Sequence, residues 1–379
     1  MKKKISIPLW FLSSLLRFFF VKKGVYCFVA THNKPWGCNM EAFCHYIAGL
    51  STTNRIYILN FSTSSNSEIM ADFFDYSVPV TIFTETKSLS TLWGLVHPEL
   101  FFLNDYSTFR VPGRKINLWH GIPLKKIGVF QHKKHKALNR KFSKVVSAKS
   151  KFDHNNMAKA FNMPLEKVIA SGLPRHDWVM GTLPLPPSSL AQVETLKKQL
   201  NGKKLVLYAP TFRDGDVEGL PICADKLKAW AELLSKYGYV LGVRCHLIRR
   251  TNHNLRNLGV IDLSSMEFKN IEVVYSLTDI LVTDYSSVSV DFMLTNKPIL
   301  GLDVSENSYN RGFMLDFDAL FPGSFHKDWV IFIEHMVDII SGAGSRFDYS
   351  NQKTQLLGNY SGYACRALAE QLDILNTEQ

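Results

Sequence analysis

The sequence predicts an α/β protein built from two doubly wound, Rossmann-like domains that face each other across a cleft. Short apolar runs alternate with helical patterns along most of the chain, which is typical of parallel sheets covered by helices. A length of 379 residues suits two domains at roughly 150 residues each. A proline-rich stretch, residues 183–189, divides the alternation into two series.

The first series, residues 24–182, is expected to form the N-terminal domain. It opens with a buried strand at 25–30 and a helix around 40–50. Further apolar runs of strand length follow, bounded by turn residues. They cover residues 55–59, 79–83, 100–103, 115–119, 144–148 and 168–172.

The second series, residues 190–362, is expected to form the C-terminal domain, followed by a terminal helix or tail at 363–379. The linker prediction at 183–189 depends on three prolines in four positions, which cannot continue a helix or a central strand. Helices are predicted at 190–200 and 226–237. The predicted strands cover 205–208, 240–244, 271–274, 279–283 and 298–302.

Residues 1–23 form an apolar segment flanked by lysines. The run is shorter than the roughly 20 apolar residues that a membrane-spanning helix needs, and Ser13, Ser14 and Arg17 interrupt it. No small-x-small cleavage site follows, which speaks against a signal peptide. Its Trp, Phe and Leu content favours a helix lying in the membrane interface. An ordinary first helix packed on the domain is the alternative.

Lysine and arginine outnumber aspartate and glutamate by 44 to 33, which gives a formal net charge of +11. That surplus favours anionic partners. Basic residues are concentrated in residues 125–151, which we expect to be a dock for anionic headgroups and a lipid-carrier pyrophosphate, or a solvated helix face. The six cysteines lack metal-type spacing, which indicates reduced thiols.

Polar side chains in the first series follow predicted strands, where parallel sheets bind ligands. His120 comes directly after the run that ends at Trp119, and Gly121 and Pro123 enforce a tight turn behind it. A histidine held there suits a general base, and a histidine bonded to nearby backbone is the alternative. Arg175 also follows a strand and a turn, where it can grip a phosphate.

Two turns in the second series carry cationic and hydroxyl groups. Pro210 breaks a strand and presents Thr211 and Arg213, which suit phosphate oxygens. Alternation along the next strand puts Arg244 and His246 on one side, where they can stabilise charge on a departing phosphate. A solvated loop is the alternative for the first turn.

A third turn precedes a helix predicted at 288–295. The hydroxyls of Ser286 and Ser287, with the N–H groups of the helix start, form an anion site. The alternative for Asp284 is a simple N-cap. Asp291, one turn further, either accepts hydrogen bonds from donor hydroxyls or lies on an exposed helix face.

Five blocks of residues, in this order, resemble the CDP-glycerol glycerophosphotransferase family, the teichoic-acid primases and polymerases of bacterial cell walls. They are WHGIPLK (119–125), SGLPRHD (171–177), YAPTFRD (208–214), RCH (244–246) and TDYSSVSVDFMLTNKPIL (283–300). The resemblance implies a GT-B-like pair of domains, in which the N-terminal domain serves the acceptor and the C-terminal domain binds the CDP-linked donor.

The resemblance also implies roles for single residues. His120 matches the proposed base for the acceptor hydroxyl, and His246 is expected to stabilise the leaving group. Ile122 stands where the family more often has threonine, which removes a hydroxyl. The positions expected to contact or shape the donor site are Trp119, Gly121, Ile122, Pro123, Arg175, Pro210, Thr211, Arg213, Arg244, Ser286, Ser287 and Asp291.

The implied activity is transfer of glycerol phosphate from CDP-glycerol to an undecaprenyl-type lipid-linked acceptor, with release of CMP. The protein is expected to be peripheral, on the cytoplasmic side of the cell membrane. No cofactor or obligatory metal is expected, because no Asp, Glu or His cluster has metal-ligand spacing. No nucleic-acid partner is expected either, because a known binding motif is missing.

Several alternatives stay open at this point. The donor can be CDP-ribitol or another CDP-polyol in place of CDP-glycerol. A nucleotide-sugar glycosyltransferase or epimerase of the same architecture is a second alternative. A basic binding protein without activity is a third. The long N-terminal extension of the family's polymerases is absent, which favours a primase-like or capsule-related enzyme.

Overall fold

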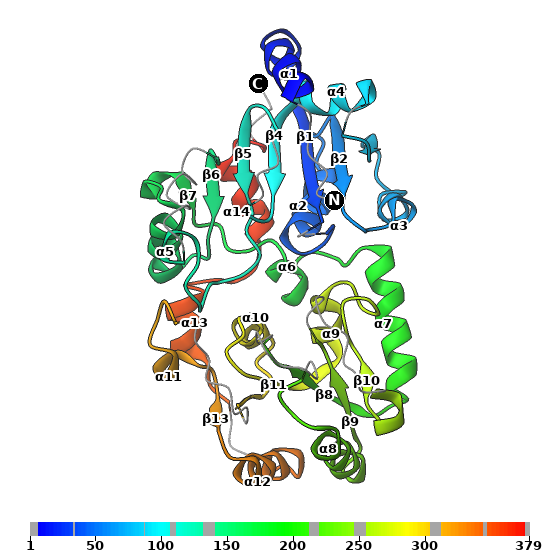
Figure 1. Cartoon of the computed structure of the whole chain (residues 1–379), viewed down its shortest axis with the longest axis vertical. Helices are drawn as coiled ribbons and strands as arrows, with labels where there is room; N and C mark the ends of the chain where they lie inside the picture. Colours follow the sequence, from blue (N-terminus) through cyan, green and yellow to red (C-terminus); the bar gives the residue numbers. More distant parts are fainter. Residues whose placement is uncertain are drawn as a thin grey trace. The chain divides into compact units, whose positions relative to one another are not determined.

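The computed structural model describes most of the chain as two compact units (Figure 1). Unit 1 comprises Met1–Ile122, Ile127–Ser188 and Leu357–Gln379, and unit 2 comprises Pro123–Lys126 and Ser189–Leu356. The described residues are 7–32, 35–86, 88–106, 111–131, 141–211, 220–245, 255–303, 312–343 and 347–375.

Unit 1 is built on a seven-stranded sheet with the order β3-β2-β1-β4-β5-β6-β7, in which all neighbouring strands run parallel. The order reverses next to β1, as in doubly wound sheets. Residues 24–30 of β1 are all buried, as expected of a parallel strand covered on both faces. The strands are β1 (Lys22–Thr31), β2 (Arg55–Phe61), β3 (Val80–Phe83), β4 (Pro98–Leu103), β5 (Arg114–Asn117), β6 (Lys144–Val146) and β7 (Val168–Ile169).

Helices from both ends of the chain cover this sheet. They are α1 (Ile7–Phe20), α2 (Cys38–Ala48), α3 (Asn66–Ala71), α4 (Leu89–Val96), α5 (Lys151–Phe161), α6 (His176–Val179) and α14 (Ala364–Gln371), with short 3-10 turns at Gly128–Phe130 and Leu165–Lys167. No described helix combines the length and apolar character needed to cross a bilayer.

The C-terminal helix α14 returns to unit 1, where it packs against α2 and α6. The Asp177 carboxylate holds its start, because it accepts hydrogen bonds from the backbone N–H groups of Ala364 and Cys365 at 2.8 Å each. A carboxylate at a helix N-terminus satisfies otherwise unpaired N–H groups. The chain from Leu357 onward therefore belongs to unit 1.

Unit 2 is built on a six-stranded parallel sheet with the order β10-β9-β8-β11-β12-β13. Its strands are β8 (Lys204–Ala209), β9 (Tyr239–Val243), β10 (Ile261–Asp262), β11 (Thr278–Thr283), β12 (Ile299–Leu302) and β13 (Ser324–His326). Its helices are α8 (Ala224–Lys236), α9 (Ile271–Leu277), α10 (Val288–Phe292), α11 (Phe317–Leu320), α12 (Trp329–Ile340) and α13 (Ser350–Leu356), with 3-10 turns at Leu255–Leu258 and Met293–Thr295. These two parallel sheets confirm the predicted fold class.

One predicted strand is a helix in the structure, and one predicted linker is partly helical. Residues 271–274, predicted as a strand, belong to helix α9; a four-residue apolar run cannot distinguish a strand from a buried helical turn. Helix α7 (Pro187–Leu200) begins inside the predicted linker. Proline is tolerated in a first helical turn, and the Asp72 carboxylate accepts hydrogen bonds from the Ser188 N–H and hydroxyl at 2.7 Å each.

Candidate active site

The His120 turn begins two residues earlier than the sequence suggests, because β5 ends at Asn117. The Asn117 side chain accepts a hydrogen bond from the Trp119 N–H at 2.9 Å. Trp119 then adopts a φ of 54°, a left-handed conformation that is rare for bulky residues. The backbone thus reverses at the end of the strand and delivers His120 at the carboxyl edge of the sheet.

The imidazole of His120 is fixed on two sides. Its Nδ1 lies 2.9 Å from the Asn104 carbonyl oxygen, and a carbonyl can only accept, so Nδ1 carries a proton. Nε2 is therefore the ring nitrogen that can accept a proton, and the backbone carbonyl sets the tautomer that a general base would need. The Trp119 ring packs against the imidazole with centroids 4.1 Å apart.

Trp119 itself is 4% exposed and belongs to the hydrophobic core of unit 1. Its ring also contacts Tyr106 and Phe161. The contact by which this side chain can affect chemistry is therefore the one with His120. Gly121, Ile122 and Pro123 are buried as well.

Asn39, at the start of α2, connects two of the predicted site turns. Its side-chain amide donates to the carbonyls of Leu118 and Trp119 at 3.0 and 3.1 Å. Its side-chain oxygen accepts from the Arg175 N–H at 3.1 Å. Arg175 is 7% exposed, and its Nη1 donates to the Cys38 sulfur at 3.3 Å. The His120 and Arg175 turns therefore lie together within unit 1.

In unit 2, the turns after β8 and β11 are joined by short hydrogen bonds. The Asp284 carboxylate accepts from the Thr211 N–H at 2.7 Å, and the Thr283 hydroxyl donates to the Ala209 carbonyl at 2.6 Å. The N-cap alternative for Asp284 is therefore wrong, since the N-cap residue of α10 is Ser287. Asp284 instead joins the two turns. Pro210 and Thr211 are half-buried at this edge.

Lys125 lies beside Thr211, with its Nζ 3.4 Å from the Thr211 hydroxyl oxygen. The segment that carries it belongs to unit 2, because Lys125 pairs antiparallel with Phe313 and backbone hydrogen bonds link residues 124–126 with 312–314. An ammonium beside a hydroxyl at the end of a parallel strand suits a phosphate. Sequence reasoning assigned Lys125 to the basic stretch and gave it no site role.

The predicted helix at 288–295 is shorter than expected, with five residues in α10 followed by a 3-10 turn. Ser286 and Ser287 are half-buried before it, and the Ser286 carbonyl accepts from the Ser289 hydroxyl at 2.9 Å. Asp291 is 2% exposed. The alternative of an exposed aspartate on a helix face is therefore wrong, because this side chain is buried.

Arg244 directly follows β9, and its guanidinium binds backbone oxygens. It donates to the carbonyls of Leu263, Phe268 and Lys269 at 2.6, 2.8 and 3.2 Å. The side chain therefore holds the loop that precedes α9, and its donor contact stays a prediction. Arg213 and His246 lie outside the described residues, as does the part of the basic stretch from 132 to 140.

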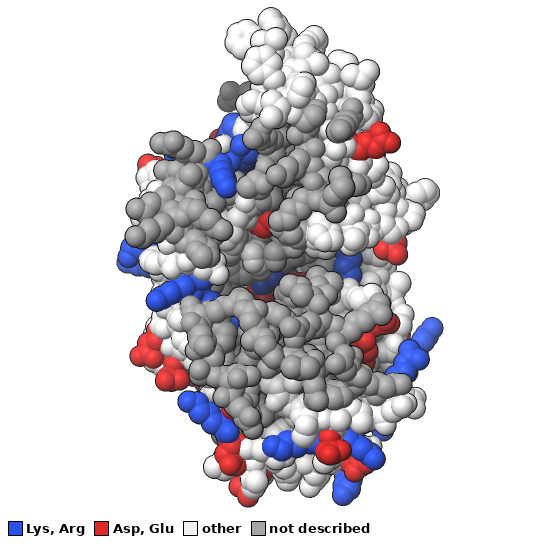
Figure 2. Space-filling model, in the orientation of Figure 1, with Lys and Arg blue, Asp and Glu red and all other residues white. Residues whose placement is uncertain are grey.

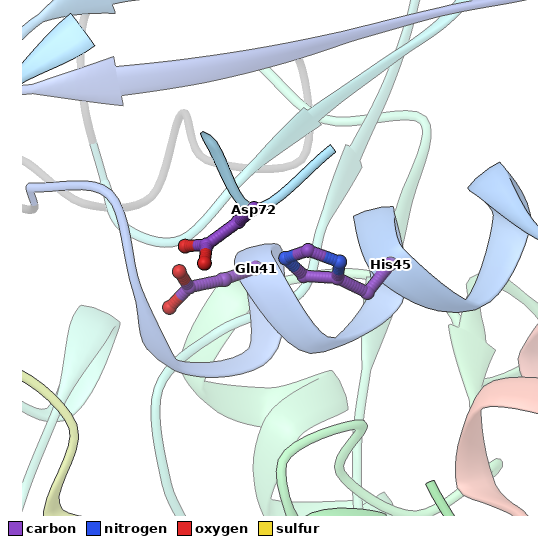
Figure 3. A group of neighbouring side chains, drawn as sticks. All are labelled: Glu41, His45 and Asp72. Carbon is purple, nitrogen blue, oxygen red and sulfur yellow. The ribbon is translucent and has the colours of Figure 1, made fainter. Parts of the chain in front are cut away.

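Three buried side chains of unit 1 form a group that sequence reasoning missed. Glu41 and His45 are four residues apart on α2, and their ligand atoms and one of Asp72 lie within 4.8 Å of one another. Figure 3 shows the two carboxylates and the imidazole pointing toward each other. Trp36 donates to Glu41 at 3.0 Å, the Tyr76 hydroxyl lies 3.3 Å from His45, and Asp72 holds α7.

These partners give the Glu41–His45–Asp72 group a structural role, since together they join α2, α3 and the start of α7. Buried polar groups need hydrogen-bond partners, and the Trp36 indole, the Tyr76 hydroxyl and Ser188 supply them here. Helical i,i+4 spacing was the signal that could have found the pair on α2. The absence of an obligatory metal stays a prediction.

Solved structures with the same pair of parallel α/β units show which class of fold this is. The chain has the fold of the wall teichoic acid polymerase TagF, with a TM-score of 0.74 and 17% identity over 97% of this chain and 94% of that one. It also resembles a putative UDP-N-acetylglucosamine 2-epimerase from Listeria monocytogenes, with a TM-score of 0.57 and 11% identity over 94% of this chain and 98% of that one.

The chain belongs to the CDP-glycerol:poly(glycerophosphate) glycerophosphotransferase family, whose model matches residues 11–353. It is 28% identical to a teichoic acid glycerol-phosphate transferase of Staphylococcus aureus over 84% of each chain. It is 25% identical to a teichoic acid poly(glycerol phosphate) polymerase of Bacillus subtilis over 85% of this chain. The chain spans only 44% of that polymerase's length.

Proposed function

We propose that this protein transfers glycerol phosphate from CDP-glycerol to a lipid-linked acceptor in the synthesis of a teichoic-acid or capsule-type polymer, with release of CMP. Family membership supports the donor, and a variant of TagF has been solved after soaking with CDPG. The observation that carries the proposal is the His120 turn, in which the Asn104 carbonyl fixes the Nδ1–H form of the imidazole.

The proposed reaction is a single displacement at phosphorus. The acceptor oxygen forms a bond to the phosphorus that bears glycerol, and the bond from that phosphorus to the CMP oxygen breaks. The acceptor proton passes to Nε2 of His120, and CMP leaves as an anion. Positioned cations and hydroxyls stabilise the charge that develops on the phosphate oxygens.

The donor contacts we propose come from residues at strand ends. In unit 2, Lys125 and Thr211 already lie within 3.4 Å of each other, and Asp284 fixes the Thr211 backbone. In unit 1, Asn39 holds the backbone of Arg175. His120 precedes Lys125 by only five residues, so a short stretch of chain joins the proposed base to the segment proposed to bind phosphate. The remaining donor contacts are proposed at Pro210, Arg213, Arg244, His246, Ser286, Ser287 and Asp291.

We propose that α1 docks the protein on the cytoplasmic face of the membrane. Its inward side meets unit 1 through the buried Leu9 and Ser13, and Arg17 donates to the carbonyls of Leu95 and Val96 at the end of α4 and of Pro98 in β4. Its outward side carries exposed apolar side chains, and in Figure 2 the surface over α1 is white, the colour of residues other than Lys, Arg, Asp and Glu. The exposed apolar side chains of α1 and α4 include Ile7, Phe11, Leu15, Phe18, Phe19, Leu89 and Trp93.

This exposed apolar side of α1 suits a bilayer interface. Phe18 is 87% exposed, and the rings of Phe20 and Trp93 join the two helices into one apolar surface. Lys22 and Lys23 are exposed beside it, where they can meet anionic headgroups.

Ribitol phosphate is a second candidate for the transferred group. The chain is 28% identical to a teichoic acid ribitol-phosphate primase of Bacillus spizizenii over 63% of this chain and 66% of that protein. Both candidates use the same displacement and release CMP, so only the polyol differs.

The test compares donors under one set of conditions. Purified protein is incubated with a lipid-linked disaccharide and with CDP-glycerol, CDP-ribitol or UDP-N-acetylglucosamine, and the released nucleotide is measured. Our proposal predicts CMP from CDP-glycerol at the highest kcat/KM. Faster turnover of CDP-ribitol would favour the second candidate, and UDP release alone would overturn both.

A further inference from the structure

We propose that Asn39 is a positioning residue for the transfer reaction, because one buried amide fixes both the turn that carries His120 and the turn that carries Arg175. The inference rests on the proposed function. Asn39 does not touch the reacting atoms; it acts through the backbone of the residues that do.

The hydrogen bonds of Asn39 use its amide in both directions. The NH₂ group donates to the carbonyls of Leu118 and Trp119, and the side-chain oxygen accepts from the Arg175 N–H. The residue is fully buried. Aspartate can replace only the accepting half of this pattern, and an apolar residue can replace neither half. The site therefore selects an amide.

The His120 turn needs such support because its backbone is unusual. Trp119 has a φ of 54°, and bulky residues hold a left-handed conformation only where surrounding groups over-determine it. Asn117 fixes the Trp119 N–H, and Asn39 fixes its carbonyl. That carbonyl belongs to the peptide unit that leads directly into His120, so its orientation sets where the imidazole lies.

Three buried asparagines, Asn39, Asn104 and Asn117, hold the His120 turn through hydrogen bonds. Asn104 supplies the carbonyl that binds Nδ1 of His120, and its side chain donates to the Gly37 carbonyl at 3.4 Å. The Asn117 amide donates to the Asp105 carbonyl at 2.9 Å. Of the three side chains, Asn39 alone also holds the Arg175 turn, which is why it is the residue to test.

The experiment uses the full-length protein with the variants Asn39→Asp and Asn39→Leu. Asn39→Asp keeps the acceptor for the Arg175 N–H and loses both donors to the His120 turn. We expect kcat for CMP release to fall about 10- to 100-fold while KM for CDP-glycerol changes less than about 3-fold, because a displacement of about 1 Å is enough to slow chemistry to this extent. Asn39→Leu releases both turns, so kcat should fall and KM should rise.

Asn60→Asp is the matched control. Asn60 is 4% exposed near the end of the neighbouring strand β2, and its amide donates to the Ser64 carbonyl and the Asn66 side chain in a local loop. The same chemical change is therefore made at a comparable depth, at a side chain whose hydrogen bonds go to Ser62, Ser64 and Asn66 and not to the His120 or Arg175 turn. We expect a lowered Tm with kcat and KM within about 2-fold of wild type, since no site turn depends on Asn60.

All kinetics are measured at least about 15 °C below each variant's Tm, after far-UV circular dichroism has shown a folded protein. A folded Asn39→Asp variant with wild-type kcat overturns the inference, and so does a fall in kcat that Asn60→Asp reproduces. If neither Asn39 variant folds, the residue is structural and the inference is also wrong. Absence of CMP release by the wild-type protein would instead refute the proposed function itself.

Discussion

Asp153 is a fully buried carboxyl group in the first turn of α5. One of its oxygens accepts a hydrogen bond from the Ala148 N–H at 2.7 Å. Burial raises the pKa of Asp153 to about 7, although this hydrogen bond acts in the opposite direction. Between about pH 4 and pH 7 the folded protein therefore keeps a proton on Asp153. The unfolded chain, with an ordinary aspartate pKa of ~3.9, releases it.

This shift predicts a pH dependence of stability. The contribution of Asp153 is fully present below about pH 4 and is lost as pH rises through about 7, because the native state binds the extra proton. The amide in the Asp153→Asn variant cannot titrate, so the free energy of unfolding of this variant relative to wild type should rise by about 2 kcal/mol between pH 5 and pH 8. Urea unfolding at the two pH values measures it. If the difference in free energy of unfolding between variant and wild type were the same at both pH values, burial would not raise the pKa of Asp153.

Some residues of the candidate site can be located from the sequence, and others only from the fold. The positions of His120, Thr211 and Ser286 at the carboxyl edge of a sheet could be predicted because each follows an apolar strand. The bond from Arg175 to Asn39 joins residues 136 positions apart. No local pattern encodes such a pairing, so Asn39 could not be identified before the fold was known.

At the scale of elements, two aspartates bridge the same pair of strands at opposite ends. Asp284 holds the Thr211 N–H after the carboxyl ends of β11 and β8, and Asp279 holds the Leu205 N–H near their start, at 2.8 Å. We expect Asp284→Ala to raise KM for CDP-glycerol about 10-fold, because the Thr211 turn loses its anchor.

Asp279→Ala is the control for this prediction. Both substitutions leave a backbone N–H without its acceptor, so both should lower the free energy of unfolding by about 1–3 kcal/mol. Only Asp284→Ala should change KM, which steady-state kinetics with purified variants measures. An equal rise in KM for both variants would mean that sheet stability, and not the Thr211 turn, determines donor affinity.

Helix α1 allows a matched test of membrane docking. Phe18 on α1 and Phe74 beyond α3 are each 87% exposed, but only Phe18 lies in the apolar surface of α1 and α4. We expect Phe18→Ser to weaken binding to anionic phospholipid vesicles about 5- to 10-fold in co-sedimentation, because it removes a large apolar side chain from the interface. Phe74→Ser should bind as wild type. Equal binding by both variants would contradict the docking surface.

Elements differ in how well their sequences predict them. The long buried strands β1, β2 and β11 have continuous apolar runs and agree with the predictions. β10 (Ile261–Asp262) and β13 (Ser324–His326) mix apolar with polar residues and leave no such run. The α9 segment was mistaken for a strand because its apolar residues are consecutive.

At the scale of the whole molecule, the path of the chain determines which residues belong together. The chain leaves unit 1 after Ile122, contributes Pro123–Lys126 to unit 2, and returns at Ile127. The WHGIPLK block therefore supplies His120 to one unit and Lys125 to the other. The sequence predicts this block as one turn. The division into units shows that its first half belongs to unit 1 and its second half to unit 2.

The central claim is that His120 is the base of a CDP-glycerol-dependent transfer, and the most direct measurement is the kcat of CMP release by His120→Asn. We predict a fall of about 10²- to 10⁴-fold with KM for CDP-glycerol nearly unchanged, because general-base catalysis contributes rates of this order. His97→Asn, which alters a histidine bonded to Tyr57 at the end of α4, should retain wild-type kcat. CMP release by His120→Asn at the wild-type rate would contradict the account.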